Sequence, residues 1–389
     1  MGKALRCGRA VRSLLLLWCL GCAGCASLPQ QAPPSDVDLA WVLAGAGTLP
    51  ADGGGLEGLD SLMHVSDEMH RFAEEATRGR HGVVRKTAAL VAALSEDDGL
   101  RLQYDASATL TAEQAFTQRR ANCLSYTLLF AALARDVGVN VEFNDVEIPP
   151  VWDLGDARTS LLYRHLNLRI EVAPPIYQVV DVSGQDYDPS FEQQVIPDVQ
   201  AEAQFYNNRA MELLLADQPA DALRHELRAL ELSPKASFLW VNLANLYLRQ
   251  DQLRAARIAV ERGLALDRSS MLGYETAALV YRGLSQPRLA EAFHQRAQEF
   301  LDQNPYYHYQ LALAALDRRD ERTAYEETRR AIELRQQEPR FYFLLALLEN
   351  RRGEAHLAED NMQMVMELTR DPAQQERFRN KFARLKTQG

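Results

Sequence analysis

The carboxy-terminal half of this 389-residue chain carries a period of 34 residues in its small side chains. Alanine recurs at that spacing in two rows, and a third row holds alanine, glycine or valine. The rows are Ala210, Ala244, Ala278, Ala312 and Ala346, then Ala222, Ala256, Ala290, Ala324 and Ala358, then Ala229, Gly263, Ala297, Ala331 and Val365. One row of a residue this common would mean little, but two complete rows at one spacing indicate a repeated unit. Such units stack into a solenoid because none buries its apolar face alone.

A large ring precedes each member of the first row by four residues: Tyr206, Trp240, Tyr274, His308 and Tyr342. The segment WVNLANLY at 240–247 resembles the W-x₂-L-G-x₂-Y signature of tetratricopeptide repeats, with alanine in place of glycine. The resemblance implies helix-turn-helix units with small residues where the helices cross. It predicts five repeats and a capping helix over residues 201–386, the cap at 371–386. Prolines 234, 305 and 339 fall between repeats, where a helix must stop.

The same resemblance implies a concave surface that receives a peptide or a neighbouring domain. Groove-facing positions of the family fall on Met211, Leu214, Leu248, Leu279, Tyr309, Leu313, Phe343 and Leu347. These side chains would form an apolar lining with two large rings. An equally simple interpretation is that they pack between the helices. We expect a protein or peptide partner on the repeats.

The first residues have the pattern of an export signal. Residues 1–12 carry four basic side chains and no acidic one, and an apolar run from Leu14 to Leu20 follows. That run is too short to span a bilayer. The next segment, Cys22 to Cys25, resembles the lipobox of bacterial lipoproteins. It predicts a signal peptide over 1–25 and lipidation of Cys25.

Two alternatives to this anchor stay open: lipidation of Cys22, and a plain secretory signal cleaved near Ala26. With lipidation, residues 26–59 are expected to be a spacer that begins with a proline-rich stretch. An Asp at position 26 would be the usual inner-membrane retention signal in bacteria with two membranes. Because Ala26 stands there, we expect an exported protein that is lipid-anchored to the outer membrane and faces the periplasm.

Cysteine use points to one residue. Four of the five cysteines lie within the first 25 residues, so lipidation of Cys25 leaves Cys123 as the only thiol of the mature chain. Asn122 is a good N-cap for the apolar periodic segment that follows, with Leu124 and Leu128 on its apolar side. Cys123 then lies in the first turn of a helix, where backbone N–H groups favour a thiolate.

Two strand-like segments follow. Residues 165–172 alternate strictly, with Leu166, Leu168, Ile170 and Val172 on the core face and His165 on the other. Residues 177–182 form the second segment. A hairpin centred near residues 173–174 would bring His165 and Asp181 almost opposite each other, close enough for the carboxylate to orient the imidazole. A thiol, an imidazole and a carboxylate so arranged suit nucleophilic acyl transfer.

The stretch ANCLSYTLLFAALAR at 121–135, followed by His165 and Asp181, resembles the transglutaminase-like superfamily. The resemblance implies an α+β, papain-like core over residues 60–198, with Cys123 as nucleophile, His165 as base and acid, and Asp181 as the orienting group. Two departures weaken the implied activity more than the fold. Leu166 stands where an aromatic residue commonly follows the histidine, and Ala121-Asn122 stand where glycine is frequent.

Each of these residues also has a simpler interpretation. Cys123 could be a small buried apolar residue, His165 a surface residue and Asp181 a turn former. Three more residues, Gln114, Asn122 and Trp152, suit an oxyanion hole or a substrate wall, but capping and packing would explain them equally well. The chain order Cys, His, Asp favours the catalytic interpretation.

The sequence therefore predicts an envelope lipoprotein whose thiol acts on peptide or protein amides, as hydrolase or acyltransferase, while the repeats recruit the substrate. The alternative is a non-catalytic repeat scaffold with a degenerate transglutaminase-like domain. The substrate, the oligomeric state and the choice between water and an amine as acceptor stay open. With 43 basic against 53 acidic side chains, nucleic acid is not an expected partner. No metal-ligand spacing is found, and no cofactor is expected.

Overall fold

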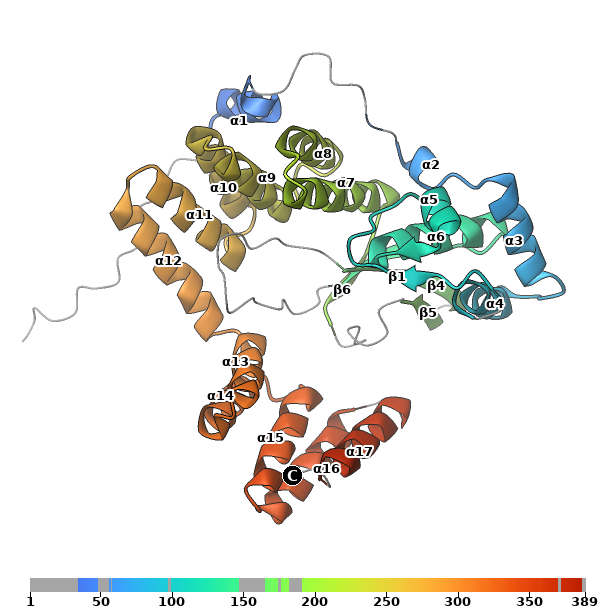
Figure 1. The fold of residues 1–389 in the computed structure, drawn as a ribbon, viewed down its shortest axis with the longest axis vertical. Coiled ribbons are helices and arrows are strands. Elements are labelled where there is room, and N and C mark those ends of the chain that lie inside the picture. Colours follow the sequence, from blue (N-terminus) through green and yellow to red (C-terminus); the bar gives the residue numbers. More distant parts are fainter. Residues whose placement is uncertain are drawn as a thin grey trace, which may run out of the picture.

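The computed structural model describes residues 34–47, 56, 58–96, 99–146, 165–173, 176–181, 191–369 and 372–386. A compact α+β part lies beside the start of a long helical array, which runs away from it and turns toward the carboxy terminus (Figure 1). None of the helices in these ranges is long and apolar enough to cross a bilayer.

The first part contains six helices and a short 3₁₀ turn. They are α1 (Asp36–Leu43), η1 (Gly45–Gly47), α2 (Leu59–Leu62), α3 (Asp67–Thr77), α4 (Val83–Ser95), α5 (Ala112–Gln118) and the central α6 (Cys123–Asp136). Every residue of α6 from 124 to 134 is buried. The sequence predicted one apolar side. The other side is also covered, because α3, α4 and α5 pack on the helix along with the sheet.

A small antiparallel sheet completes this part. It contains β3 (Glu142–Val146), β4 (His165–Ala173), β5 (Ile176–Val180) and β6 (Gln193–Ile196), in the order β5-β4-β3-β6. A separate parallel pair joins β1 (Gln103–Tyr104) to β2 (Arg120–Ala121). Leu166, Leu168 and Ile170 of β4 are buried, as their alternation predicted, and Asn167 between them is also fully buried.

The helical array consists of five helix pairs. They are α7 (Asp198–Leu215) with α8 (Pro219–Leu232), α9 (Ser237–Arg249) with α10 (Leu253–Leu266), α11 (Met271–Gly283) with α12 (Pro287–Asp302), α13 (Pro305–Asp317) with α14 (Glu321–Leu334), and α15 (Pro339–Arg351) with α16 (Ala355–Leu368). Both alanine rows are buried throughout. A side chain on Gly263 would bring its Cβ to 3.0 Å from Val241 Cγ2. The small rows therefore mark close helix crossings.

The turn that joins the two helices of each pair contains one residue whose backbone is in the left-handed conformation, with a positive φ angle. These residues are Asp217, Asp251, Ser285, Arg319 and Gly353, with φ between 57° and 78°. They recur every 34 residues, and only the last is glycine, the residue that adopts this conformation without strain. Pro305 and Pro339, predicted to lie between repeats, are instead the first residues of α13 and α15. Their missing N–H groups leave no helical bond unmade there.

The last helix, α17 (Pro372–Lys386), occupies the segment predicted to cap the array. Its Phe378 and Phe382 rings lie 5.2 Å and 6.4 Å from the Phe343 ring of the preceding pair. An array needs such a helix because its terminal repeat would otherwise expose an apolar face.

The apolar core of the array is interrupted between α12 and α13. One continuous buried cluster extends from the first part of the chain as far as Ala297, and separate clusters serve the last two repeats. Helix α12 runs to Asp302, leaving only residues 303–304 before α13, whereas four residues separate the other consecutive pairs. The extended helix and short linker accompany a less extensive packing of α13 on α12 than at the other junctions.

Part of the predicted spacer is folded against the repeats. Helix α1 lies on α10, and its Val42 is fully buried. The Val42 carbonyl oxygen accepts a hydrogen bond of 2.6 Å from Tyr247 Oη. The Arg254 guanidinium lies 4.8 Å from the centre of the Trp41 ring and 3.2 Å from an oxygen of Asp38. Residues 36–47 therefore belong to the folded body, although they fall inside the 26–59 spacer.

The repeat register makes a testable prediction at Ala256. Replacing it with leucine inserts a branched side chain at a closed helix crossing, which should lower the free energy of unfolding by about 1–3 kcal/mol. Ala265 lies on the same helix but is exposed, so Ala265→Leu should change it by less than about 0.5 kcal/mol. Urea unfolding of both variants measures the difference, and equal stabilities would contradict the register.

Candidate functional site

The amino end of α6 is anchored by buried polar contacts. Asn122 Oδ1 accepts from the Ser125 backbone N–H at 2.9 Å, and Asn122 Nδ2 donates to Thr109 Oγ1 at 2.7 Å. The Ser125 hydroxyl donates to the Ala108 carbonyl and accepts from the Leu110 N–H. This cap satisfies N–H groups that a helix start leaves unpaired. It fixes the backbone of Cys123, the first helical residue.

A second contact joins this helix start to β4. Thr127 Oγ1 lies 2.8 Å from the carbonyl oxygen of Cys123 and 3.0 Å from that of Leu166, and shares its one proton between them. Leu166 is the neighbour of His165 along the strand. The contact therefore fixes the distance between the backbone that carries the thiol and the backbone that carries the imidazole.

His165 and Asp181 form a close, buried pair. Their side chains are 9% and 7% exposed, and His165 Nε2 lies 2.6 Å from Asp181 Oδ2. Asn167 Nδ2 donates to the same carboxylate oxygen at 2.9 Å. Asn144 Nδ2 in turn donates to Asn167 Oδ1 at 2.8 Å and to Gln193 Oε1 at 2.9 Å. A chain of hydrogen bonds thus holds the carboxylate in place.

The strands β4 and β5, which carry His165 and Asp181, are paired in a different register from the one predicted. Leu168 is paired with Val180, so the next pair places Asp181 opposite Asn167, and a bulge between Glu171 and Ala173 shifts the hairpin. His165 therefore meets the carboxylate diagonally, two residues along the strand. A diagonal neighbour on the same face lies within reach of a long side chain such as histidine.

The thiol of Cys123 completes the group. Burial lowers the pKa of His165, but hydrogen bonds to Asp181 and Cys123 and the charges of both outweigh it and raise the pKa to about 9. Cys123 itself is partly exposed. The imidazole is therefore protonated at neutral pH, and it lies beside a thiol that solvent reaches. Burial and the Asp181 charge raise the pKa of nearby Tyr126 to about 12, which keeps its phenol neutral.

The sequence predicts three members of this site, Cys123, His165 and Asp181, but it does not predict the residues that hold them in place. Asn144, Asn167 and Thr127 carry no motif, and only the tertiary contacts reveal them. Gln114, considered for an oxyanion hole, is part of a capping box with Thr111: its Oε1 accepts from the Thr111 N–H at 3.2 Å. Trp152 and Cys25 lie outside the described residues. Within the described ranges, no group of three or more His, Cys, Asp and Glu side chains is placed to hold a metal ion.

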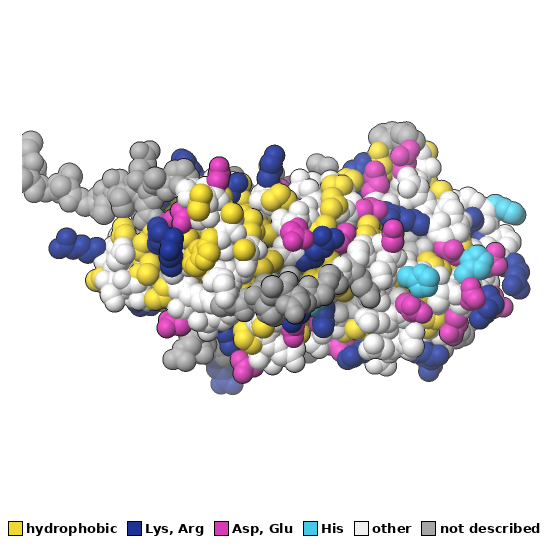
Figure 2. Space-filling view, turned by 90° about the horizontal axis from the view of Figure 1, so that it is seen from above, with side chains coloured by type: hydrophobic (Ala, Val, Ile, Leu, Met, Phe, Trp, Pro, Cys, Tyr) yellow, Lys and Arg dark blue, Asp and Glu magenta, His cyan; other side chains and the backbone are white. Residues whose placement is uncertain are grey.

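The predicted groove residues of the repeats divide into two sets. Met211, Leu214 and Phe343 are buried between helices, so they contribute to packing. The others are partly accessible, and Leu313 is 39% exposed: Leu248, Leu279, Tyr309, Leu313 and Leu347. Basic and acidic side chains intermingle on the face seen in Figure 2, without a continuous basic stripe of the kind that follows a phosphate backbone.

No family model matches the chain, and no curated protein matches it. The solved structure of YrrB, a TPR protein with an unusual peptide-binding site, is 18% identical over 46% of this chain and 92% of its own, with a TM-score of 0.25. MamA from Desulfovibrio magneticus RS-1 is 18% identical over 43% and 94%, with the same TM-score. PilF of Pseudomonas aeruginosa is 15% identical over 49% and 86%, with a TM-score of 0.26. By its own 34-residue helix pairs, the carboxy-terminal half is an array of tetratricopeptide-like repeats.

Proposed function

We propose that the first part of the chain is a transglutaminase-like domain that acts on a peptide or protein amide, and that the repeats recruit the substrate. The observation that carries the proposal is the placement of the His165 imidazole between a buried carboxylate and the Cys123 thiol. Nucleophile, base and orienting group are the three parts that thiol-dependent acyl transfer requires.

In the proposed reaction, the Cys123 proton moves to His165, and the thiolate attacks the amide carbonyl carbon. The backbone N–H groups at the start of α6 would stabilise the negative oxygen that forms. The imidazolium then returns its proton to the leaving nitrogen, the C–N bond breaks, and the acyl group remains on sulfur as a thioester. Water or an amine attacks the thioester, releases the acid or a new amide, and restores the thiol. Asp181 orients the imidazole through both steps and is itself held by Asn167.

A second candidate is a non-catalytic scaffold whose repeats bind an envelope protein. Two departures from the family pattern favour it: Leu166 in place of an aromatic residue, and Ala121-Asn122 before the cysteine. In this reading, the side chains that join α6 to the sheet have only a structural part. The repeats bind a protein or peptide partner in both proposals, through the accessible groove positions named above.

Attachment to the membrane is proposed through a lipid on Cys25, with the folded part facing the periplasm from the outer membrane. The order of segments in the first 25 residues supports this proposal, because a basic segment is followed by an apolar run and then by small residues. Replacing Cys25 with alanine should move the mature chain from the membrane to the soluble fraction, while Cys22→Ala should leave it membrane-bound. Release by Cys22→Ala alone would assign the anchor to that residue instead.

The reactivity of the thiol tests the catalytic proposal directly. Iodoacetamide should alkylate Cys123 of the full chain rapidly at about pH 6, because the imidazolium stabilises the thiolate. His165→Ala should slow that step by at least about tenfold at this pH. Mass mapping of the peptide that contains Cys123 separates it from the other cysteines. Equal rates in the two proteins would reject the catalytic role and leave the scaffold.

The charged pair also makes stability depend on pH. The ordinary pKa of histidine is 6.5 and that of folded His165 is about 9. Its stabilisation is therefore complete below the first value and is lost as pH rises through the second. Asp181→Asn should destabilise the fold strongly at about pH 6 and much less at about pH 10, where the imidazole is neutral. Urea unfolding at the two pH values measures this, and a pH-independent loss would contradict the ion pair.

A further inference from the structure

Three consecutive loop residues hold the cap at the start of α6. The Ala108 carbonyl oxygen accepts from the Asn122 N–H at 3.2 Å and from the Ser125 hydroxyl at 2.9 Å. Thr109 Oγ1 accepts from Asn122 Nδ2 at 2.7 Å, and the Leu110 N–H donates to Ser125 Oγ at 2.6 Å. The place where the helix begins therefore depends on where this loop lies.

The loop is in turn held from the first repeat. The Thr109 N–H donates to Glu212 Oε1 of α7 at 3.0 Å, and Glu212 Oε2 accepts from Arg209 Nη1 at 2.7 Å. Thr109 is only 2% exposed, so water does not readily replace the carboxylate as the partner of its N–H. A buried N–H without an acceptor costs free energy. Loss of the Glu212 carboxylate should therefore displace the loop.

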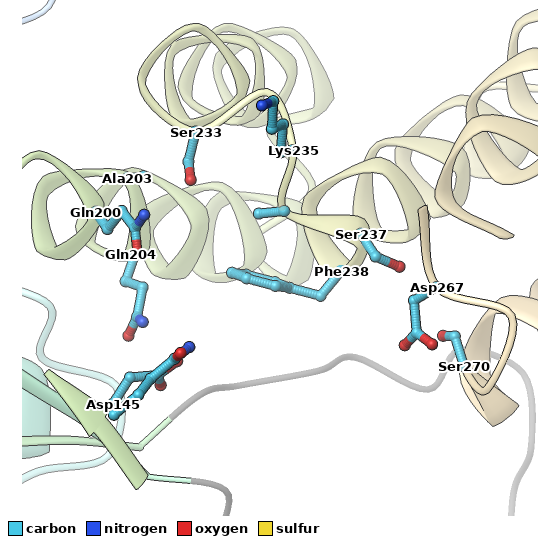
Figure 3. Close-up of a pocket in the computed structure, with 12 residues that line it drawn as sticks. Asp145, Gln200, Ala203, Gln204, Ser233, Lys235, Ser237, Phe238, Asp267 and Ser270 are labelled. Carbon is cyan, nitrogen blue, oxygen red and sulfur yellow. The ribbon is translucent and has the colours of Figure 1, made fainter. Parts of the chain in front are cut away.

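Another part of α7 faces away from the thiol site. A cavity of about 340 Å³ is lined by Gln204 of α7 and by Asp145 of β3 (Figure 3). Because Asp145 pairs with Leu166, the cavity borders the face of the sheet opposite to His165. Glu212 lies about two helical turns further along α7, and its contact reaches the cap.

We propose that Glu212 is a positioning residue for the Cys123 thiol. It acts through Thr109 and Asn122, which hold the start of α6. Cys123 opens that helix and thereby stays within reach of the His165 imidazole. The inference rests on the proposed acyl-transfer function, because the distance between thiol and imidazole matters only if the imidazole acts on the thiol. The first repeat then completes the thiol site, in addition to its place in the array that recruits the substrate.

Alkylation of Cys123 by iodoacetamide in the full chain tests the role of Glu212. Glu212→Met removes the acceptor at similar length. It should slow alkylation at about pH 6 by at least about fivefold, because the displaced thiol loses the imidazole that activates it. At about pH 9.5, where an ordinary thiol is ionised, its rate should stay within about twofold of wild type. Glu212→Gln keeps an oxygen acceptor and should stay within about twofold at both pH values.

A second variant covers the case in which Glu212→Met does not fold, which thermal melting would reveal. Thr109→Val removes the hydroxyl that accepts from Asn122 at similar volume and keeps the N–H that Glu212 binds. It should slow alkylation at about pH 6 in the same way. Wild-type rates in the folded variants would overturn the positioning role.

Asp198→Asn is the matched control. Asp198 joins the same two helices through Arg135, at the other end of α6 and away from the cap. Its replacement weakens the junction without touching residues 108–110, so it should leave the alkylation rate unchanged at both pH values. Equal slowing in Asp198→Asn and Glu212→Met would mean that only the general stability of the junction matters, and would also overturn the positioning role.

Combining Glu212→Met with His165→Ala separates this inference from the proposed function. If Glu212 acts through the thiol and the imidazole, its replacement should add less than about twofold to the slowing caused by His165→Ala alone. A wild-type rate that does not depend on His165 would reject the proposed function and this inference with it. A rate that depends on His165 but not on Glu212 or Thr109 would reject only the inference.

Discussion

Enclosure of helix α6 is the constraint on which the rest of the structure depends. Its middle residues are buried on every side, so α3, α4, α5 and the sheet are all positioned by contact with one helix. Cys123 opens this helix, and the N-cap that starts it is buried with it. A residue at the first turn of an enclosed helix has little freedom to move. The position of Cys123 relative to His165 and Asp181 is therefore a consequence of how the core is packed.

The repeats are joined to this core and are not a separate attachment. Glu212 of α7 accepts a hydrogen bond of 3.0 Å from the Thr109 N–H, and the Thr109 hydroxyl accepts from the N-cap residue Asn122. Arg135 near the end of α6 forms a two-pronged pair with Asp198 at the start of α7. The first repeat is thus joined to both ends of the helix that carries Cys123, directly at Arg135 and through Thr109 at the amino end. Such continuity explains why one apolar cluster spans both parts and ends only within the third repeat.

The structure contains two polar regions at this junction, on opposite faces of one small sheet. One face gathers His165, Asn167 and Asp181 beside a thiol, and every described polar group there has a hydrogen-bond partner. The other face borders a cavity in which Gln204 has an acceptor without a partner. A hydrogen-bond network in which every group already has a partner suits the positioning of side chains within the protein.

The amino-acid sequence by itself determined the features that depend on local periodicity and short-range chemistry. The 34-residue spacing of alanine predicts the helix pairs, since only small residues allow backbones to cross closely, and Asn122 predicts the start of α6, since its cap bonds to a residue three positions away. The features that depend on contacts between residues far apart in the sequence were decided by the tertiary structure alone. A two-residue shift of the hairpin places Asn167 opposite Asp181, and two added residues in α12 accompany the interrupted core. Helix α1 is part of the body only because Tyr247 and Arg254, some two hundred positions later, meet it. Contacts between residues this far apart leave no periodic trace in the chain, so they become visible only when the backbone has folded.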